Sequence, residues 1–432
     1  MENKDVTKKN YYSKVMGMPA QWFFAGAVII LLSAWMGILP ANMIGGFAVC
    51  MALGNILFYI SMNLGFIRET LGGMAMIALS CGILKYFNVW PENLLSVANG
   101  FINGSTDFIT FYICGLICGS IMGMNRKLLI QAGARYFIPI IGGVFVAYTF
   151  AGIVGQAIGM GWKDALLYVA GPIMGGGTGG GAIPMSEIYS EVTGIGKDVV
   201  FSKIYPAVTI GGITSLFFAA IINTIGKKFP TLSGNGALMR GFALDETESN
   251  FAFEMNLQDL GIGLFMSVSF FILGKIVGNY IPTFHFYAYV IVIVAAVKIM
   301  GILPERMEFA AMQWYKFLSS AFTITLMAGV GLTMVNIGEL LAILTPAFFL
   351  LCVSVVLGGV IGAGFTGLLV KFYFVESAIT AGLCMSNVGG NGDVGILSAS
   401  ERMNLMPFAQ ISSRLGGAFI LIVQGLLIRL LL

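Results

Sequence analysis

Charged side chains are scarce in this chain. Asp, Glu, Lys and Arg make up 10% of its 432 residues, against about 25% in an ordinary soluble domain. The net charge of +3 is small and there is no arginine-rich run, so nothing favours a nucleic-acid-binding protein. With 58% hydrophobic residues and a mean hydropathy of +0.91, the composition predicts an all-α polytopic membrane protein.

Histidine is scarce as well, and the cysteines show no paired spacing. A single histidine, His285, excludes a multi-histidine metal cluster. The six cysteines lie in apolar segments without CxxC spacing, which favours free packing thiols over disulfides or a zinc site. The sequence shows no nucleophile with a neighbouring base, so we expect neither an enzyme nor a resident cofactor.

Eleven hydrophobic runs have the length of about 17–25 residues that crosses a hydrocarbon core. They lie near residues 22–39, 43–62, 71–87, 107–124, 136–159, 198–225, 259–281, 284–303, 314–336, 339–370 and 404–431. Lys and Arg favour cytoplasmic loops, and the polar N-terminal segment 1–21 carries four lysines. This bias predicts a retained cytoplasmic tail, an external loop near 88–106 and an external C-terminus.

Two glycine-rich segments, near 164–185 and 375–399, remain outside that count. The first contains GGGTGGG and the second GGNG. The charge bias of the loops stays consistent only if each segment enters and leaves the membrane by the same face. We therefore expect two re-entrant hairpins, the first entering from outside and the second from the cytoplasm.

The two glycine segments mark an internal repeat. Gly176–Gly179 aligns with Gly389–Gly392, and a serine followed by a cation lies downstream of each, at Ser202-Lys203 and Ser413-Arg414. A polar linker, 227–258, separates a half 40–226 from a half 259–432, each with five spans and a hairpin, while the helix 22–39 is extra. An odd number of spans inverts the second half, and inverted repeats with interrupted segments indicate a secondary transporter.

Irregular backbone at membrane depth persists only where protein buries it or where it lines a polar cavity. Helix N-termini around such a cavity attract anions. We therefore expect the two hairpin tips to meet around one anion site. Close helix packing at the glycines is the competing explanation.

Arg414 is the first candidate ligand. It lies about ten residues into the last span, roughly 15 Å deep, where an arginine costs on the order of 3 kcal/mol. Its planar guanidinium suits a carboxylate, while a salt bridge to Asp393 is the structural alternative. Lys203 holds the matching position in the first half, or extends to the outer interface.

Acidic residues are the second group of candidates. Asp393 with Asn387 suits a small cation, and a protonatable carboxyl would serve proton coupling equally well. Asp107, Asp259 and Glu376 lie at span ends, where we expect them to cap helices at the interface.

On these motifs the chain resembles the 2-hydroxycarboxylate transporter family, bacterial carriers of citrate, malate and lactate. The resemblance rests on the paired GGxG motifs and on SSRLGG at the last span. It implies a homodimer in the bacterial cell membrane, in contact with lipid, and an elevator movement that carries both hairpins. We expect no nucleic-acid partner.

The resemblance also assigns site residues. The substrate carboxylate would contact Gly177, Thr178, Gly179, Val388, Gly390, Asn391, Ser413 and Arg414, with Lys203 nearby. The sodium ion of sodium-driven members would lie at Ile173, Gly175, Cys384, Met385, Asn387 and Asp393. No other cofactor is implied beyond this coupling ion, sodium or a proton.

Two positions depart from the sodium-dependent citrate members of that family. Val388 occupies the position at which those members carry an arginine, in a motif that resembles NRGGSG. Thr178 occupies a position at which they tend to carry Asn. One cation fewer favours malate over citrate, and the second departure weakens the case for sodium. We expect a malate carrier, with citrate as a further substrate, that works by sodium or proton symport. The alternative is exchange of malate or citrate against lactate. An anion channel is a distant alternative.

Overall fold

The computed structural model describes residues 14–63, 72–104, 106–124, 126–239, 253–254, 256–281, 285–387 and 390–431. These residues are almost entirely helical. A short antiparallel pair, β1 Lys14–Val15 and β2 Met18–Pro19, precedes the first helix. The predicted tail and linker fall partly outside the described residues.

Seven helices in the described part of the chain are long and apolar enough to cross a membrane. They are α3 Met43–Asn63, α8 Arg126–Ala157, α12 Lys197–Lys228, α13 Leu257–Tyr280, α15 Glu305–Thr333, α17 Pro346–Leu369 and the run Met403–Leu431. Each overlaps a predicted span. The all-α polytopic class is therefore confirmed.

The remaining predicted spans coincide with shorter apolar helices. These are α2 Ala20–Trp35, α5 Gly72–Tyr86, α7 Phe108–Met122 and α14 Phe286–Met300. Their lengths alone do not decide whether they cross, so the count of eleven stays a prediction.

Two local features differ from the expected spans. The run 339–370 is divided into α16 Ile337–Ile343 and α17, because Thr345 caps α17 through the Phe348 N–H and Pro346 occupies its first turn. The predicted external loop 88–106 contains α6 Glu92–Ile102. This helix packs against α3, and its apolar face explains why a loop was the wrong expectation.

The described chain forms two compact units. The first comprises the residues up to Tyr112 together with Leu318–Gly338, and in it α3 packs against α5 and α6. The second comprises Ile113–Phe317 and Glu339–Leu432, and it contains both glycine segments.

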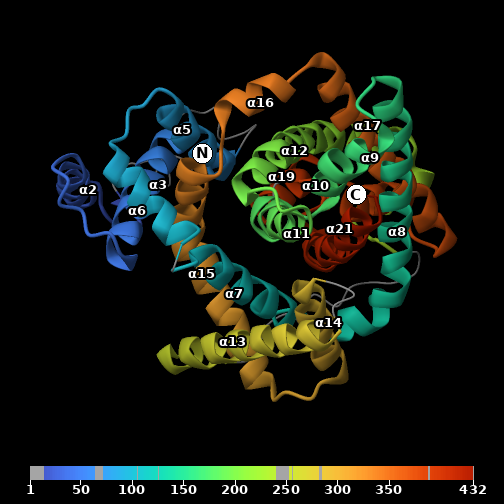
Figure 1. Cartoon of the computed structure of the whole chain (residues 1–432). Helices are drawn as coiled ribbons and strands as arrows, with labels where there is room; N and C mark the ends of the chain where they lie inside the picture. Colours follow the sequence, from blue (N-terminus) through green and yellow to red (C-terminus); the bar gives the residue numbers. More distant parts are fainter. Residues whose placement is uncertain are drawn as a thin grey trace, which may run out of the picture. The chain divides into compact units, whose positions relative to one another are not determined.

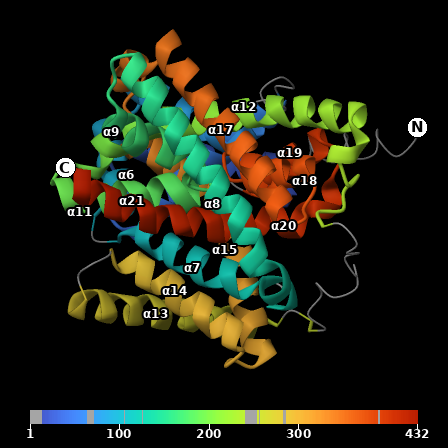
Figure 2. The ribbon, with the colours of Figure 1, turned by 90° about the vertical axis from the view of Figure 1, so that its right-hand side faces the viewer.

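Glycines allow close helix packing in the second unit. There α8 lies along α17 (Figure 2), and a Cβ on Gly362 would approach the Gly142 carbonyl oxygen to 2.3 Å. Small residues at such crossings are typical of membrane helices. The packing explanation for glycine therefore holds at this crossing, away from the two glycine segments.

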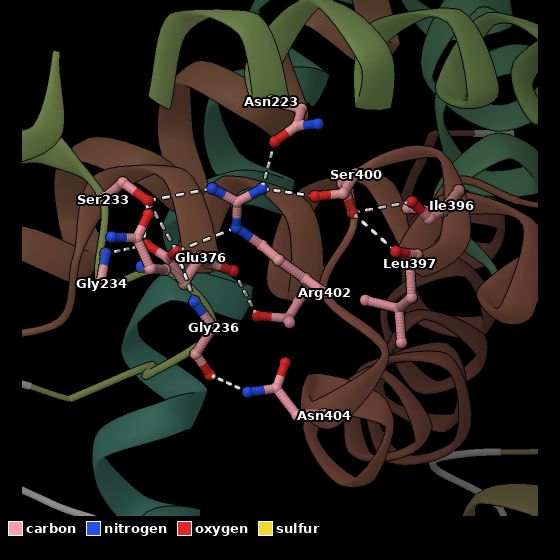
Figure 3. A network of polar contacts seen from close by, with 12 residues as sticks. Asn223, Ser233, Gly234, Gly236, Glu376, Ile396, Leu397, Ser400, Arg402 and Asn404 are labelled. Atoms are coloured by element: carbon pink, nitrogen blue, oxygen red, sulfur yellow. Dashed lines mark hydrogen bonds and ion pairs between the residues drawn. The ribbon is translucent and has the colours of Figure 1, made fainter. Parts of the chain in front are cut away.

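A buried network of polar contacts around one ion pair joins the segment after α12 to the second glycine segment (Figure 3). Glu376, in α18 Phe374–Ser377, is 0% exposed, and its Oε1 accepts a hydrogen bond from Arg402 Nε at 2.9 Å. Arg402 also donates to Asn223 and Ser233, while the Gly234 N–H donates to the Glu376 carboxylate. Glu376 as an interfacial cap is thus wrong, because its carboxylate is satisfied inside the protein.

Asp259 is a helix cap, as expected. Its side chain accepts from the Asn256 N–H in a reciprocal capping box at the start of α13. Arg306 lies 3.4 Å from its other oxygen. The carboxylate is therefore held at a helix end and is not available for the site below.

Candidate functional site

The first glycine segment is a broken helix. Its descending arm comprises α9 Trp162–Ala165, the π-helix η1 Leu166–Ala170 and α10 Gly171–Met174. Its returning arm comprises the π-helix η2 Thr178–Ala182 and α11 Ile183–Thr193. The break needs glycine, because Gly176 and Gly177 have φ of +78° and +101°, a region that side chains rarely adopt.

The second glycine segment is also a broken helix with a π-helix before the break. It runs from α18 into the π-helix η5 Ala378–Leu383, breaks, and returns as α19 Gly390–Ala399. Val388 and Gly389 lie outside the described residues, as does the side chain of Asn391. Gly390 begins α19, so the aligned motif stands at a helix N-terminus in both segments.

The two breaks meet inside the second unit. The Gly176 N–H donates to the Met385 carbonyl oxygen at 3.3 Å, and Ser386 Oγ lies 3.2 Å from Met174 Sδ. Both arms and α19 pack against α12 (Figure 1). The tips are thus in direct backbone contact, although the sequence separates them by about half its length.

The last span completes this contact. It passes through α20 Met406–Ile411, the π-helix η7 Ser412–Gly416 and α21 Gly417–Leu431. A Cβ on Gly176 would lie 2.3 Å from the Ser413 carbonyl oxygen, and one on Gly417 would lie 2.8 Å from that of Gly175. Close approach of three backbones is therefore the physical reason for glycine here.

Asp393 lies buried at this junction, 2% exposed. Its Oδ1 accepts from Asn387 Nδ2 at 2.6 Å and its Oδ2 from Ser413 Oγ at 2.9 Å. Asn387 also donates to the Cys384 carbonyl oxygen. Carboxylate, amide and carbonyl oxygens of this kind are the ligands that a hard cation prefers.

Five of the six suggested sodium residues lie at this junction. The Cys384 carbonyl oxygen accepts from Asn387, the Met385 carbonyl oxygen accepts from Gly176, and the Gly175 carbonyl faces Gly417. Ile173, which is fully buried, packs against Gly211 of α12 instead.

Arg414 lies in η7, directly after Ser413. Its Nη1 donates to the Ser120 carbonyl oxygen at 2.9 Å, and its Nη2 lies 3.4 Å from the Tyr315 hydroxyl. The ion pairs found among the described residues do not include Arg414 with Asp393, so the structural alternative for Arg414 is not seen. Arg414 lies within a π-helix, and short π-helices occur frequently at functional sites.

The predicted substrate residues of the first tip lie beside this junction, whereas Lys203 contacts Tyr168. Thr178 is 6% exposed and opens η2, with Gly177 preceding it and Gly179 following. Lys203, in α12, has its Nζ 5.6 Å from the centre of the Tyr168 ring, in the descending arm of the first hairpin. Among the described residues its recorded contact is thus this cation–π pair, not the group at Asp393.

Some residues at the site were not foreseen from the sequence. Tyr136 is fully buried in α8, and its hydroxyl lies 2.7 Å from Ser412 Oγ and donates to the Phe408 carbonyl oxygen. These contacts hold the start of η7 against α8. Ser120 and Tyr315 are the contacts of Arg414. Each looks like an ordinary polar position on an apolar helix, so no sequence signal identified it.

The arrangement can hold a carboxylate and a cation together. Glycine N–H groups at helix starts and one guanidinium suit the anion, while the oxygens around Asp393 suit the cation. The described residues contain no group of three or more His, Cys, Asp or Glu side chains that could ligate a metal.

Comparisons with known proteins confirm the family resemblance. The family model of the 2-hydroxycarboxylate transporter family matches residues 15–426. The chain is 39% identical to the Na(+)-malate symporter of Bacillus subtilis, covering 99% of this chain and 96% of that protein. It is 37% identical to the citrate transporter CitP of Leuconostoc mesenteroides (93% and 90%) and 34% to the citrate/sodium symporter of Salmonella typhimurium (96% and 94%). The chain belongs to the 2-hydroxycarboxylate transporter family.

Proposed function

We propose that this protein is a secondary carrier of 2-hydroxycarboxylates, with malate as its main substrate and citrate as a second. The observation that carries the proposal is the meeting of two broken-helix tips with the arginine-bearing turn η7. Relatives that carry malate and citrate, two of them with sodium, support it. No bond is made or broken in such a cycle, so the proposed function is not enzymatic.

In this proposal Arg414 binds one substrate carboxylate through its planar fork. The N–H groups around Thr178 and Gly390 bind the rest of the anion at helix N-termini. Val388 offers no cation at the second tip, which favours a dicarboxylate such as malate over citrate. Lys203 is a weaker candidate, because its recorded contact is Tyr168.

Sodium is the proposed coupling ion, bound beside Asp393 and Asn387. Substrate and ion would share the tip residues, so each would stabilise the site for the other. Proton symport through Asp393, or exchange of malate against lactate, would use the same site without sodium.

The proposed architecture is two inverted repeats, 40–226 and 259–432, in a homodimer of the bacterial cell membrane with a cytoplasmic N-terminus and an external C-terminus. The π-helices η1 and η5 begin at nearly the same distance before the two aligned motifs, which supports the repeat. In an elevator movement both hairpins and η7 would travel together past α7 and α15.

Counterflow of labelled malate in proteoliposomes tests the function. Vesicles loaded with unlabelled malate should accumulate label in sodium medium, and external citrate should compete. Label uptake that persists in choline and responds to internal lactate would favour exchange. If malate, citrate and lactate all fail to be carried, the proposed substrate class is wrong; a flux that neither saturates nor shows trans-stimulation would indicate a channel.

A further inference from the structure

The end of α7 holds two cations. The last four carbonyl groups of a helix have no partner within it. In the described residues, two of the four in α7 accept hydrogen bonds from the turn that follows, Gly119 from Gly123 and Ile121 from Met124. The other two accept from distant side chains: Ser120 from Arg414 at 2.9 Å and Met122 from Lys298 at 2.8 Å. Both cations thus lie at the negative end of the α7 dipole.

Only one of these cations has a carboxylate partner there. Lys298 Nζ lies 2.6 Å from Glu308 Oε2, and both side chains are buried. The guanidinium of Arg414, by contrast, is held by the Ser120 carbonyl oxygen and by Tyr315. Among the described residues Arg414 therefore makes no ion pair, and the Asp393 carboxylate acts on its charge only from a distance.

Tyr315 forms the other side of this contact. The Arg414 guanidinium carbon lies 4.9 Å from the centre of the Tyr315 ring, within the range of a cation–π interaction. A Cβ on Gly119 would lie 2.4 Å from Tyr315 Cβ, so α7 and α15 cross closely at this point. The carbonyl and the ring therefore belong to one rigid surface.

We propose that the end of α7 and the Tyr315 ring form a resting site for Arg414 in the carrier without substrate. This inference rests on the proposed function, in which Arg414 binds the substrate carboxylate. A bound carboxylate neutralises the guanidinium and is itself repelled by the carbonyl end of α7. Substrate and the resting site therefore compete for Arg414, and Tyr315 acts as a positioning residue.

The consequence concerns the empty carrier. In the elevator movement η7 passes α7, so the resting contact retains the empty carrier and substrate releases it. During exchange the carrier crosses only with substrate bound, so Arg414 does not have to leave the resting site. Net transport requires the empty carrier to return, and this step is slow because Arg414 is held at the end of α7. The resting site thus favours exchange over net flux.

The experiment compares Tyr315→Leu, Tyr315→Phe and wild-type protein in proteoliposomes. Malate exchange, net malate uptake and the KM for malate are measured for each. Phe317→Leu is the matched control, because Phe317 lies on the same helix and is 37% exposed. Loss of the ring should raise the ratio of net uptake to exchange and lower KM, each by roughly two- to tenfold, while Phe, which keeps the ring, should give a smaller change.

Several results would overturn the proposal. An unchanged ratio and KM in Tyr315→Leu would show that the ring does not retain Arg414. A raised KM with lost exchange in Tyr315→Phe would place the tyrosine hydroxyl on the substrate instead. If Leu unfolds the protein, Tyr315→Met, which fills a similar space without a ring, decides, and a ratio equal to wild type then counts against the resting site. Failure of wild-type counterflow would instead contradict the proposed function itself.

Discussion

Arg402 and Glu376 form an ion pair whose Nε and Oε1 atoms lie 2.9 Å apart, with side chains 5% and 0% exposed. We expect replacement of Glu376 by Gln to leave a buried guanidinium without its counter-charge, at a cost of about 3–5 kcal/mol. The loss should appear as a much lower Tm of the detergent-solubilised protein.

A second ion pair nearby provides the control for that prediction. Lys227 and Glu401 lie 2.8 Å apart, but their side chains are 61% and 66% exposed. Glu401→Gln should lower Tm only slightly, because an ion pair exposed to solvent contributes little to stability. Equal Tm shifts for the two Gln variants would show that burial does not decide the strength of the first pair.

Replacement by alanine should reduce malate transport at one glycine of the first tip and leave it unchanged at another. At Gly176 a Cβ would lie 2.3 Å from a backbone oxygen, at a φ of +78°, so Gly176→Ala must displace the tip and should reduce malate counterflow by at least about tenfold. At Gly180 the nearest atom is a Leu116 methyl at 3.7 Å, and Gly180→Ala should transport normally. Equal activity of the two variants would contradict the close approach of the tips.

Arg414→Lys keeps the charge and loses the planar fork. We expect the KM for malate to rise by roughly ten- to a hundredfold, since a charge-assisted bidentate contact is worth about 1.5–3 kcal/mol. Lys203→Gln should change KM much less, because Lys203 lies over Tyr168. Normal malate transport by Arg414→Lys would remove the carboxylate clamp from the proposal.

Asp393→Asn removes the buried charge and keeps the size of the side chain. If sodium binds there, the sodium concentration for half-maximal uptake should rise at least about tenfold. The KM for malate at saturating sodium should move less. Ser413→Ala, which removes one hydrogen bond to Asp393, should give an intermediate shift. Sodium dependence that is unaltered in Asp393→Asn would place the ion elsewhere.

The pair of Glu191 and His285 predicts a pH dependence of stability. His285, whose Nε2 lies 3.0 Å from Glu191 Oε2, holds the pKa of the Glu191 carboxyl below its usual value of 4.5, against the opposing effect of partial burial. A carboxyl with a lowered folded-state pKa stabilises the protein above its unfolded pKa, and that contribution is lost as the pH falls through the lowered value.

Glu191→Gln should therefore lower Tm at neutral pH, and the difference from wild type should shrink as the pH falls below the usual carboxyl value of 4.5. In a His285→Ala background the same replacement should have little effect at any pH. A Tm difference that persists in that background would mean that Glu191 stabilises α11 by another contact.

The sequence by itself determined the class of protein and the two broken segments. Hydrophobic runs can be read residue by residue, because the thickness of the bilayer imposes their length. The glycine motifs could be aligned because close backbone approach excludes every other residue at positions such as Gly176. Arg414 and Asp393 were identified by the cost of charge at membrane depth.

The tertiary structure alone decided which partners those residues have. Asp393 forms hydrogen bonds with Asn387 and Ser413, and Arg414 lies at the end of α7, although a salt bridge between the two charges was the alternative that the sequence left open. Glu376 was expected at the interface and is buried against Arg402. Such contacts depend on the packing of segments far apart in the chain, and hydropathy and charge along the sequence carry no information about that packing.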